Sequence, residues 1–162
     1  MRKQIEIKNH LKFGVHWRLI AYHKGTGIIA TVLEGHNMIV TDGLEIVTDM
    51  LIDASATWDV GLTYCELGTS AQTPVAGDAA LVAASKRKAI TSRSRSGVAG
   101  TFSTFFTAAE SNIFIKEAGL WGGSAAAAGL GTGKLFARWL SSFDNSAALY
   151  DITIEYTLTP SY

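Results

Sequence analysis

The sequence predicts a mainly β fold, a compact β-sandwich or β-barrel of about eight strands with one short α-helix. Three observations lead to this prediction. The chain has 16 glycines but only 2 prolines, so turn residues are plentiful and residues that interrupt a sheet are rare. Short segments of alternating or β-branched residues recur along the chain. A hydrophobic fraction of 48% against 17% charged residues is enough for a packed core.

The first part of the chain is expected to form an arm and a hairpin. Residues 15–22 and 27–33 are rich in β-branched and aromatic side chains, and residues 24–26, Lys-Gly-Thr, provide the turn between them. Upstream, apolar residues alternate with charged or polar ones over residues 5–12. This alternation indicates an edge strand, or a strand that pairs with a neighbouring subunit.

One helix is expected at about residues 42–54. Thr41 or Asp42 can cap its start, and Glu45 in the first turn suits the positive end of the helix dipole. Apolar residues recur at helical spacing along one broad face, which consists of Leu44, Val47 and Leu51, widened by Ile46 and Met50. We expect this face to pack against a sheet.

The remaining strands follow the helix. We expect them at residues 62–67, 98–108, 113–121, 134–140 and 149–158. Residues 68–77 are predicted to be a surface loop, and residues 110–112 and 144–146 to be turns. The Gly/Ala-rich segment 122–133 is predicted to be a loop because glycines interrupt its alanines.

Cysteine usage and hydropathy exclude several classes of protein. Cys65 is the only cysteine, which excludes an internal disulfide or a cysteine-rich metal site. Its apolar, strand-like surroundings favour a small core residue over a reactive thiol. No apolar run follows Met1–Glu6, and no stretch reaches the ~18 apolar residues of a membrane span. We therefore expect a soluble protein without a secretion signal or a membrane partner.

The charge balance argues against nucleic acid as a partner. The chain has 14 basic and 14 acidic residues and a formal net charge of zero, whereas binding to phosphates requires a surplus of Lys and Arg. A near-neutral subunit also repels its own copies little, which suits dense packing against neighbours.

Motifs for catalysis and cofactor binding fail on spacing. Residues 129–134 end in Gly-Lys like a phosphate-binding loop, but Ala128 occupies the place of the first glycine and Leu135 that of the Ser or Thr. There is no G-x-S-x-G motif, and no histidine follows His36. Ordinary surface or half-buried histidines are favoured over a metal site across a symmetry axis. We expect no catalytic site, no cofactor and no metal.

A run of basic residues is the remaining electrostatic feature. It lacks interleaved aromatic residues, so salt bridges to an adjacent subunit or to an acidic lattice surface are favoured over a nucleic-acid role. With the apolar residues near the N-terminus it gives our candidate interface residues, which are Ile5, Ile7, Leu11, Phe13, Trp17, Lys86, Arg87, Lys88, Arg93 and Arg95.

Short motifs also follow one another in an ordered set over residues 35–158. They include Thr41-Asp42-Gly43-Leu44, Glu66-Leu67-Gly68-Thr69, Asp78-Ala79-Ala80-Leu81, Ala109-Glu110-Ser111-Asn112, Ile115-Lys116-Glu117-Ala118-Gly119-Leu120, Ala137-Arg138 and Ile154-Glu155-Tyr156-Thr157-Leu158. This succession resembles bacteriophage virion proteins, which include capsid decoration (cement) proteins and tail-fibre or tail-associated proteins. The resemblance implies a β-rich fold, homotrimeric assembly and a structural role.

These observations favour a non-enzymatic capsid decoration protein, a homotrimer that binds and stabilises the lattice of major capsid proteins. Residues 1–34 would then serve attachment or subunit exchange, and residues 35–162 would form the β-rich assembly domain. The alternative is a tail-fibre, baseplate or other tail-associated protein that contacts the host or other tail proteins. The protein is expected to be made in the host cytoplasm and to reside in the virion, with the capsid surface favoured over the tail.

Overall fold

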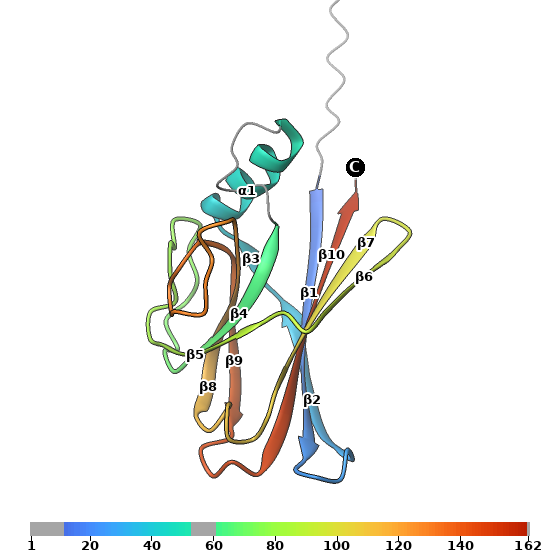
Figure 1. Cartoon of the computed structure of the whole chain (residues 1–162), viewed down its shortest axis with the longest axis vertical. Helices are drawn as coiled ribbons and strands as arrows, with labels where there is room; N and C mark the ends of the chain where they lie inside the picture. Colours follow the sequence, from blue (N-terminus) through green and yellow to red (C-terminus); the bar gives the residue numbers. More distant parts are fainter. Residues whose placement is uncertain (1–11, 53–60, 162) are drawn as a thin grey trace, which may run out of the picture.

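Two five-stranded antiparallel sheets pack face to face in the computed structural model, which describes residues 12–52 and 61–161 (Figure 1). This arrangement confirms the predicted β-sandwich with one helix. Within the described residues the two sheets keep separate hydrogen-bonding networks, so the alternative of a closed barrel is not formed.

The first sheet has the strand order β2-β1-β10-β7-β6. Its strands are β1 (Lys12–His23), β2 (Ile29–His36), β6 (Ser92–Ser96), β7 (Ala99–Phe106) and β10 (Tyr150–Ser161). The second sheet has the order β3-β9-β8-β4-β5. Its strands are β3 (Met38–Ile39), β4 (Leu62–Gly68), β5 (Ala84–Ala89), β8 (Phe114–Gly122) and β9 (Lys134–Asp144).

The chain passes from one sheet to the other at both edges of the sandwich. At one edge, Asn37 alone separates β2 of the first sheet from β3 of the second. At the other edge, Ile90 and Thr91 separate β5 from β6, and their amides bond to Thr63 and Ser103 in different sheets. In Figure 1 this second crossing runs from the left sheet to the right sheet at the front of the molecule.

Alternating residues of the paired strands fill the space between the sheets. The predicted alternation of β10 is confirmed, since Ile152, Ile154 and Tyr156 are buried. Trp17 of β1 is 6% exposed and stacks on Trp139 of β9, with the ring centroids 6.1 Å apart. The structure thus places Trp17 in the core, where its indole N–H donates to the carbonyl of His36, rather than on an interface.

The helix α1 (Thr41–Ile52) lies across one end of the second sheet (Figure 1). Its position agrees with the prediction, but its buried face differs. Ile46 is 1% exposed, whereas Leu44, Met50 and Leu51 are 49%, 51% and 76% exposed. The reason is the close approach at Gly43, where a Cβ atom would overlap the carbonyl oxygen of Phe136 on β9. The helix therefore packs through the Gly43–Ile46 side, and several of its apolar residues remain at the surface.

The other elements agree with the sequence prediction except at the sheet edges. The predicted hairpin forms, and strands β4, β7, β8, β9 and β10 lie close to their predicted limits. Residues 123–133 form a loop, as predicted. The edge strands β3, β5 and β6 were not predicted. The alternation over residues 5–11, with its candidate interface residues Ile5, Ile7 and Leu11, lies outside the described residues.

Candidate assembly surfaces

Arg138 on β9 anchors the loop 69–83 to the outer face of the second sheet. Its guanidinium is fully buried, binds Glu117 of β8 and Asp78, and donates to the carbonyl of Gln72. The Glu117 carboxylate also accepts the amide N–H groups of Val82 and Ala83, at 3.2 and 2.7 Å. One buried arginine and one buried glutamate therefore hold both ends of this loop.

Arg87 on β5 anchors the second loop, residues 123–133. Its side chain is 1% exposed and forms an ion pair with the fully buried side chain of Glu66 on β4. The guanidinium lies over the rings of Tyr64 and Trp121, at 4.6 and 5.1 Å from their centroids, and donates to the carbonyl of Thr132. The amide of Gly131 donates to Glu66 as well. Arg87 is thus engaged inside the subunit, although the sequence suggested it for an interface.

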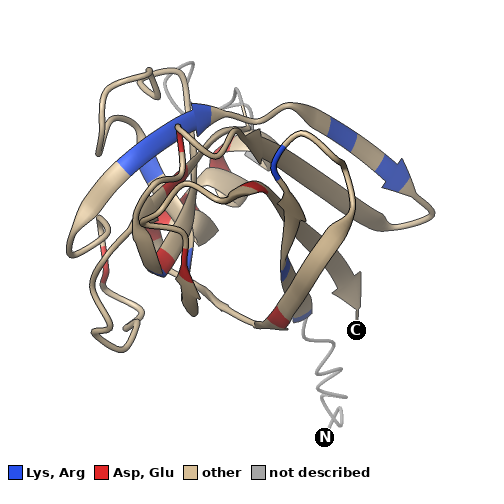
Figure 2. Ribbon diagram, turned by 90° about the horizontal axis from the view of Figure 1, so that it is seen from below, with Lys and Arg blue, Asp and Glu red and all other residues tan. Residues whose placement is uncertain are grey.

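The remaining basic candidates follow one continuous edge of the sandwich (Figure 2). Lys86 and Lys88 lie on β5, and Arg93 and Arg95 lie on β6, each strand being the outermost of its sheet. Lys88 forms an ion pair with Glu110. All of β6 is exposed. We call the β5–β6 segment, residues 84–96, the basic edge.

Edge strands can accept a further strand, because half of their backbone groups point away from the sheet. In the basic edge, the outward-facing backbone groups of β5 are followed along the chain by those of β6, and cationic side chains lie beside them. Its side chains and its backbone thus both suit an extended partner that carries acidic residues.

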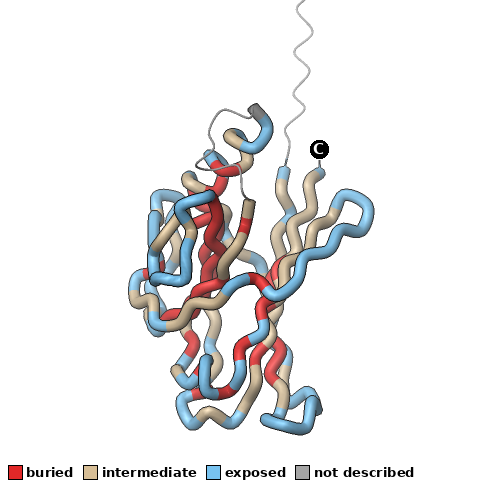
Figure 3. Tube along the Cα trace, viewed as in Figure 1, coloured by how far each residue is buried: buried red, intermediate tan, exposed pale blue. Residues whose placement is uncertain are grey.

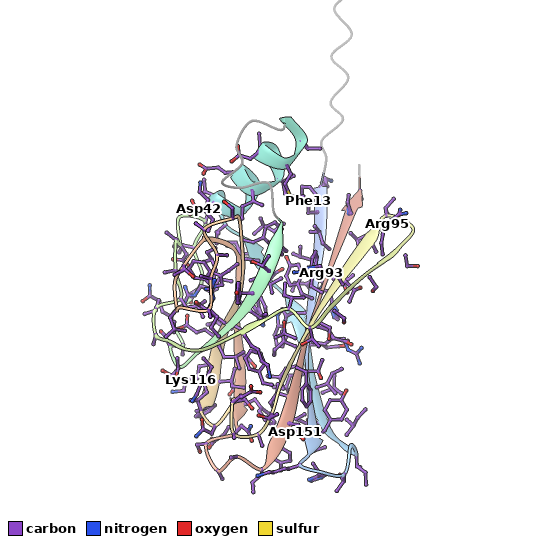
Figure 4. The ribbon with its side chains drawn as sticks, in the orientation of Figure 1. Phe13, Asp42, Arg93, Arg95, Lys116 and Asp151 are labelled. Carbon is purple, nitrogen blue, oxygen red and sulfur yellow. The ribbon has the colours of Figure 1, made fainter. Side chains whose placement is uncertain are left out.

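Arg93 has a different role from its neighbours on this edge. Its Nε and Nη2 atoms both donate to the carbonyl of Leu62, at 3.0 and 2.8 Å. Leu62 begins β4, so the side chain of Arg93 joins the first sheet to the second. Figure 4 shows Arg93 pointing into the space between the sheets, while Arg95 lies at the tip of β6.

An apolar groove opens next to Arg93, between the first sheet and helix α1. It has a volume of about 400 Å³ and joins a second hollow of about 450 Å³ through Arg93, Phe102 and Leu158. The sheet side of the groove presents Phe13, Phe102 and Leu158, and the helix side presents Val47, Met50 and Leu51. The candidate residue Phe13 lies at this end of β1 (Figure 4). We call this feature the α1 groove.

The α1 groove exists because the first sheet extends beyond the second. In the middle of the first sheet, one row of paired residues is at most 1% exposed; it consists of Leu19, Ile154 and Thr104. Further toward α1, a second row is only half-buried; it consists of Val15, Leu158 and Gly100. Figure 3 shows this change along β1, β10 and β7, from buried in the middle to half-buried or exposed at the end near α1.

Exposed apolar side chains also gather at the opposite end of the sandwich. Ile28 of the β1–β2 turn and Ile29 at the start of β2 are 63% and 57% exposed, and Leu149 is 58% exposed. The carbonyl of Leu149 accepts the amide of Lys24, so the two turns adjoin. We call these three residues the apolar tip.

The described residues contain neither an obvious metal site nor an exposed thiol. No group of three or more His, Cys, Asp or Glu side chains within residues 12–52 and 61–161 is arranged to hold a metal ion. His16 and His36 face each other across β1 and β2, with ring centroids 5.9 Å apart, and His16 lies 3.8 Å from Glu34. Cys65 is fully buried as predicted, and burial raises the pKa of its thiol.

Comparisons with known proteins found no protein similar to this chain. No family model matches the chain, and no curated protein and no solved structure matches it either. Among the described residues, no helix has the length and apolar character that crossing a membrane requires.

Proposed function

We propose that this protein is a structural subunit of a bacteriophage virion, and specifically a capsid decoration protein that assembles as a homotrimer and binds the lattice of major capsid proteins. The observation that carries the proposal is the basic edge, in which the half-buried outer strand β5 of one sheet continues into the exposed outer strand β6 of the other. The ordered motifs of residues 35–158 and their resemblance to phage virion proteins supply the biological setting.

The basic edge suits attachment to a repeated acidic surface. Lys86 and Arg95 lie near its two ends, and β6, which contains Arg95, is exposed along its whole length. Opposite charges bring partners together and set their orientation, while backbone hydrogen bonds from an added strand provide affinity. A lattice presents the same acidic segment many times. An oligomer can therefore bind several segments at once, and its overall affinity exceeds the modest affinity of each subunit.

A tail-associated protein is the second candidate, and the apolar tip favours it. Ile28, Ile29 and Leu149 are exposed, and the β1–β2 turn lies at the end of the sandwich far from α1 (Figure 1). A tail-fibre or baseplate component would use such a tip to contact the host or another tail protein. On a capsid, in contrast, the basic edge would be covered and the tip would face solvent.

Purified virions distinguish the two candidates. Quantitative mass spectrometry is expected to find this protein at a copy number comparable to that of the major capsid protein, and removal of the protein is expected to lower the temperature at which capsids burst. A copy number similar to that of tail proteins, with unchanged heat resistance, would replace the decoration role by the tail role.

The basic edge is tested by reversing its charge. The double variant Lys86→Glu/Arg95→Glu is expected to lose binding to capsids that lack the protein. The matched control Lys24→Glu/Lys116→Glu changes the net charge equally, in the β1–β2 turn and on β8, and is expected to bind normally. Equal loss in both variants would point to net charge alone and would contradict a role for this edge.

A further inference from the structure

We propose that residues 1–11 of one copy occupy the α1 groove of a second copy, so that the protein assembles with itself by exchanging N-terminal arms. The groove is a site of about 400 Å³ whose walls are almost entirely apolar. Exposed apolar surface of this kind marks an interaction site in a folded protein. Four further observations identify the occupant as the arm of another copy.

The first observation is the position of the arm. Phe13 lines the groove, and residues 1–11 precede it in the chain. The arm of every copy therefore starts at the rim of a groove. In a closed oligomer, the end of β1 in one copy and the groove of the next copy can meet without any rearrangement of the sandwich.

The second observation is the register of the apolar residues. On β1 the odd-numbered residues Phe13, Val15 and Trp17 face the interior, where they line the groove or pack in the core. The same alternation runs on through the sequence to Leu11, Ile7 and Ile5. An extended arm would therefore carry an apolar face that needs a cover, and the second sheet does not extend over this end.

The third observation concerns the direction of the chain. Residues 1–13 contain neither glycine nor proline, and Asn9 is the one polar residue that breaks the apolar alternation from Ile5 into β1. Return of an arm into its own groove would require a reversal just before β1, for which the sequence has no turn signal. Eleven extended residues span about 36 Å, which is enough to reach a neighbouring subunit.

The fourth observation is charge complementarity. Residues 1–11 carry three basic residues, Arg2, Lys3 and Lys8, against the single acidic residue Glu6. Helix α1 carries Asp42, Glu45 and Asp49 and no basic residue, although the helix residues that line the groove are apolar and Glu45 pairs with Lys134 of β9. The acidic helix therefore attracts a basic arm toward this end of the sandwich, while the apolar lining of the groove accepts the apolar side chains of the arm.

The mass of the purified full chain in solution tests the proposal. The wild-type chain is expected to be an oligomer in light-scattering or sedimentation measurements, and deletion of residues 1–11 is expected to yield a monomer. Met50→Lys/Leu51→Lys places positive charge on the exposed helix side of the groove and is also expected to yield monomers. An unchanged oligomer in either variant would overturn the proposal.

A matched control uses the apolar tip. Ile28→Lys/Ile29→Lys alters two exposed apolar residues of similar accessibility at the far end of the sandwich and is expected to remain oligomeric. Circular dichroism must show the same fold for all variants. Dissociation of this control as well would place the subunit contact at the apolar tip and contradict the groove.

Disulfide cross-linking distinguishes the arm of a second copy from the arm of the same chain. In the variant Ile7→Cys/Leu51→Cys, mild oxidation is expected to link different chains, which appear as covalent multimers on a non-reducing gel. A disulfide within one chain, or no disulfide, would overturn the exchange. The buried Cys65 does not compete for the oxidant. These measurements use purified protein, so their outcome is independent of whether the protein belongs to a virion.

Discussion

Arg138 and Glu117 form an ion pair that has no exposed surface, with Nη2 of Arg138 2.9 Å from Oε2 of Glu117. The two residues come from adjacent strands, β9 and β8, and both also bind the loop 69–83. Burial of a charge is costly unless the charge is paired and hydrogen-bonded, so the partners depend on each other.

Replacement of Arg138 is expected to be strongly destabilising. Arg138→Met leaves the Glu117 carboxylate buried without its cation and should lower the free energy of unfolding by about 3–5 kcal/mol. Urea denaturation measures this loss. The variant Arg138→Met/Glu117→Gln removes both charges and should be more stable than the single variant, since no unpaired Glu117 charge remains and the new amide keeps a carbonyl acceptor for one of the two loop N–H groups. Arg18→Ala, which removes a half-exposed ion pair with Glu155, should cost less than about 1 kcal/mol.

Replacement of Arg87 is expected to release the loop 123–133. Arg87→Met removes the donor to Thr132 and the cation that holds Glu66, on which the amide of Gly131 depends. Hydrogen exchange at Gly131 should become about tenfold faster or more. Exchange at Ala83, whose amide binds Glu117, should not change. Equal acceleration at both amides would indicate global destabilisation instead of local release.

Glu110 is expected to make the free energy of unfolding depend on pH in the acid range. The hydrogen bond from Lys88, followed by that from the backbone of Thr107, lowers the pKa of its carboxyl from 4.5 to about 2. Because the pKa is lower in the folded state, the stabilising contribution is present above pH 4.5 and is lost as the pH falls toward 2. Its size should stay below about 1 kcal/mol, since the side chain is 44% exposed and water screens the pair.

Unfolding measurements of Glu110→Gln across this pH range test the assignment. The difference in stability between wild type and variant should be present at pH 6 and should disappear near pH 2. Lys88→Met removes the main cause of the lowered pKa of Glu110. In this variant the free energy of unfolding should therefore depend less on pH than in the wild type. A difference that is constant with pH would mean that the charge of Glu110 does not contribute.

Gly43 is expected to tolerate no side chain. A Cβ atom at this position would overlap the Phe136 carbonyl oxygen, which belongs to the backbone of β9 and cannot rotate away. Gly43→Ala should therefore push α1 off the sheet and lower the melting temperature by several degrees, although alanine favours helices. Gly77→Ala is the control, since a Cβ atom there meets no neighbour within 4 Å.

Strands that bury one face could be predicted from alternation, and edge strands could not. Ile152, Ile154 and Tyr156 alternate with polar residues because one face of β10 packs in the core. The basic edge has no such face, and its Ser-Arg-Ser-Arg-Ser segment resembles a loop in composition although it forms β6. Charged residues on an edge are tolerated because that edge faces water, so hydrophobic periodicity does not reveal it.

The candidate surfaces could be predicted only in part. Lys86, Lys88 and Arg95 do lie along one edge, but the sequence did not show that Arg87 turns toward Glu66, since their pairing depends on the register of β4 and β5. The α1 groove was not predicted, because Phe13, Met50 and Leu158 are far apart in the chain. Phe13 continues the alternation of the arm and lies at the rim of this groove.

The two crossings between the sheets determine how the sandwich would respond to a pulling force. Because β2 continues into β3 and β5 continues into β6, neither sheet can be peeled away from the other by breaking side-chain contacts alone. A load applied to either edge acts on the hydrogen bonds of both sheets at once. We therefore expect the subunit to yield in a single event at high force in single-molecule stretching.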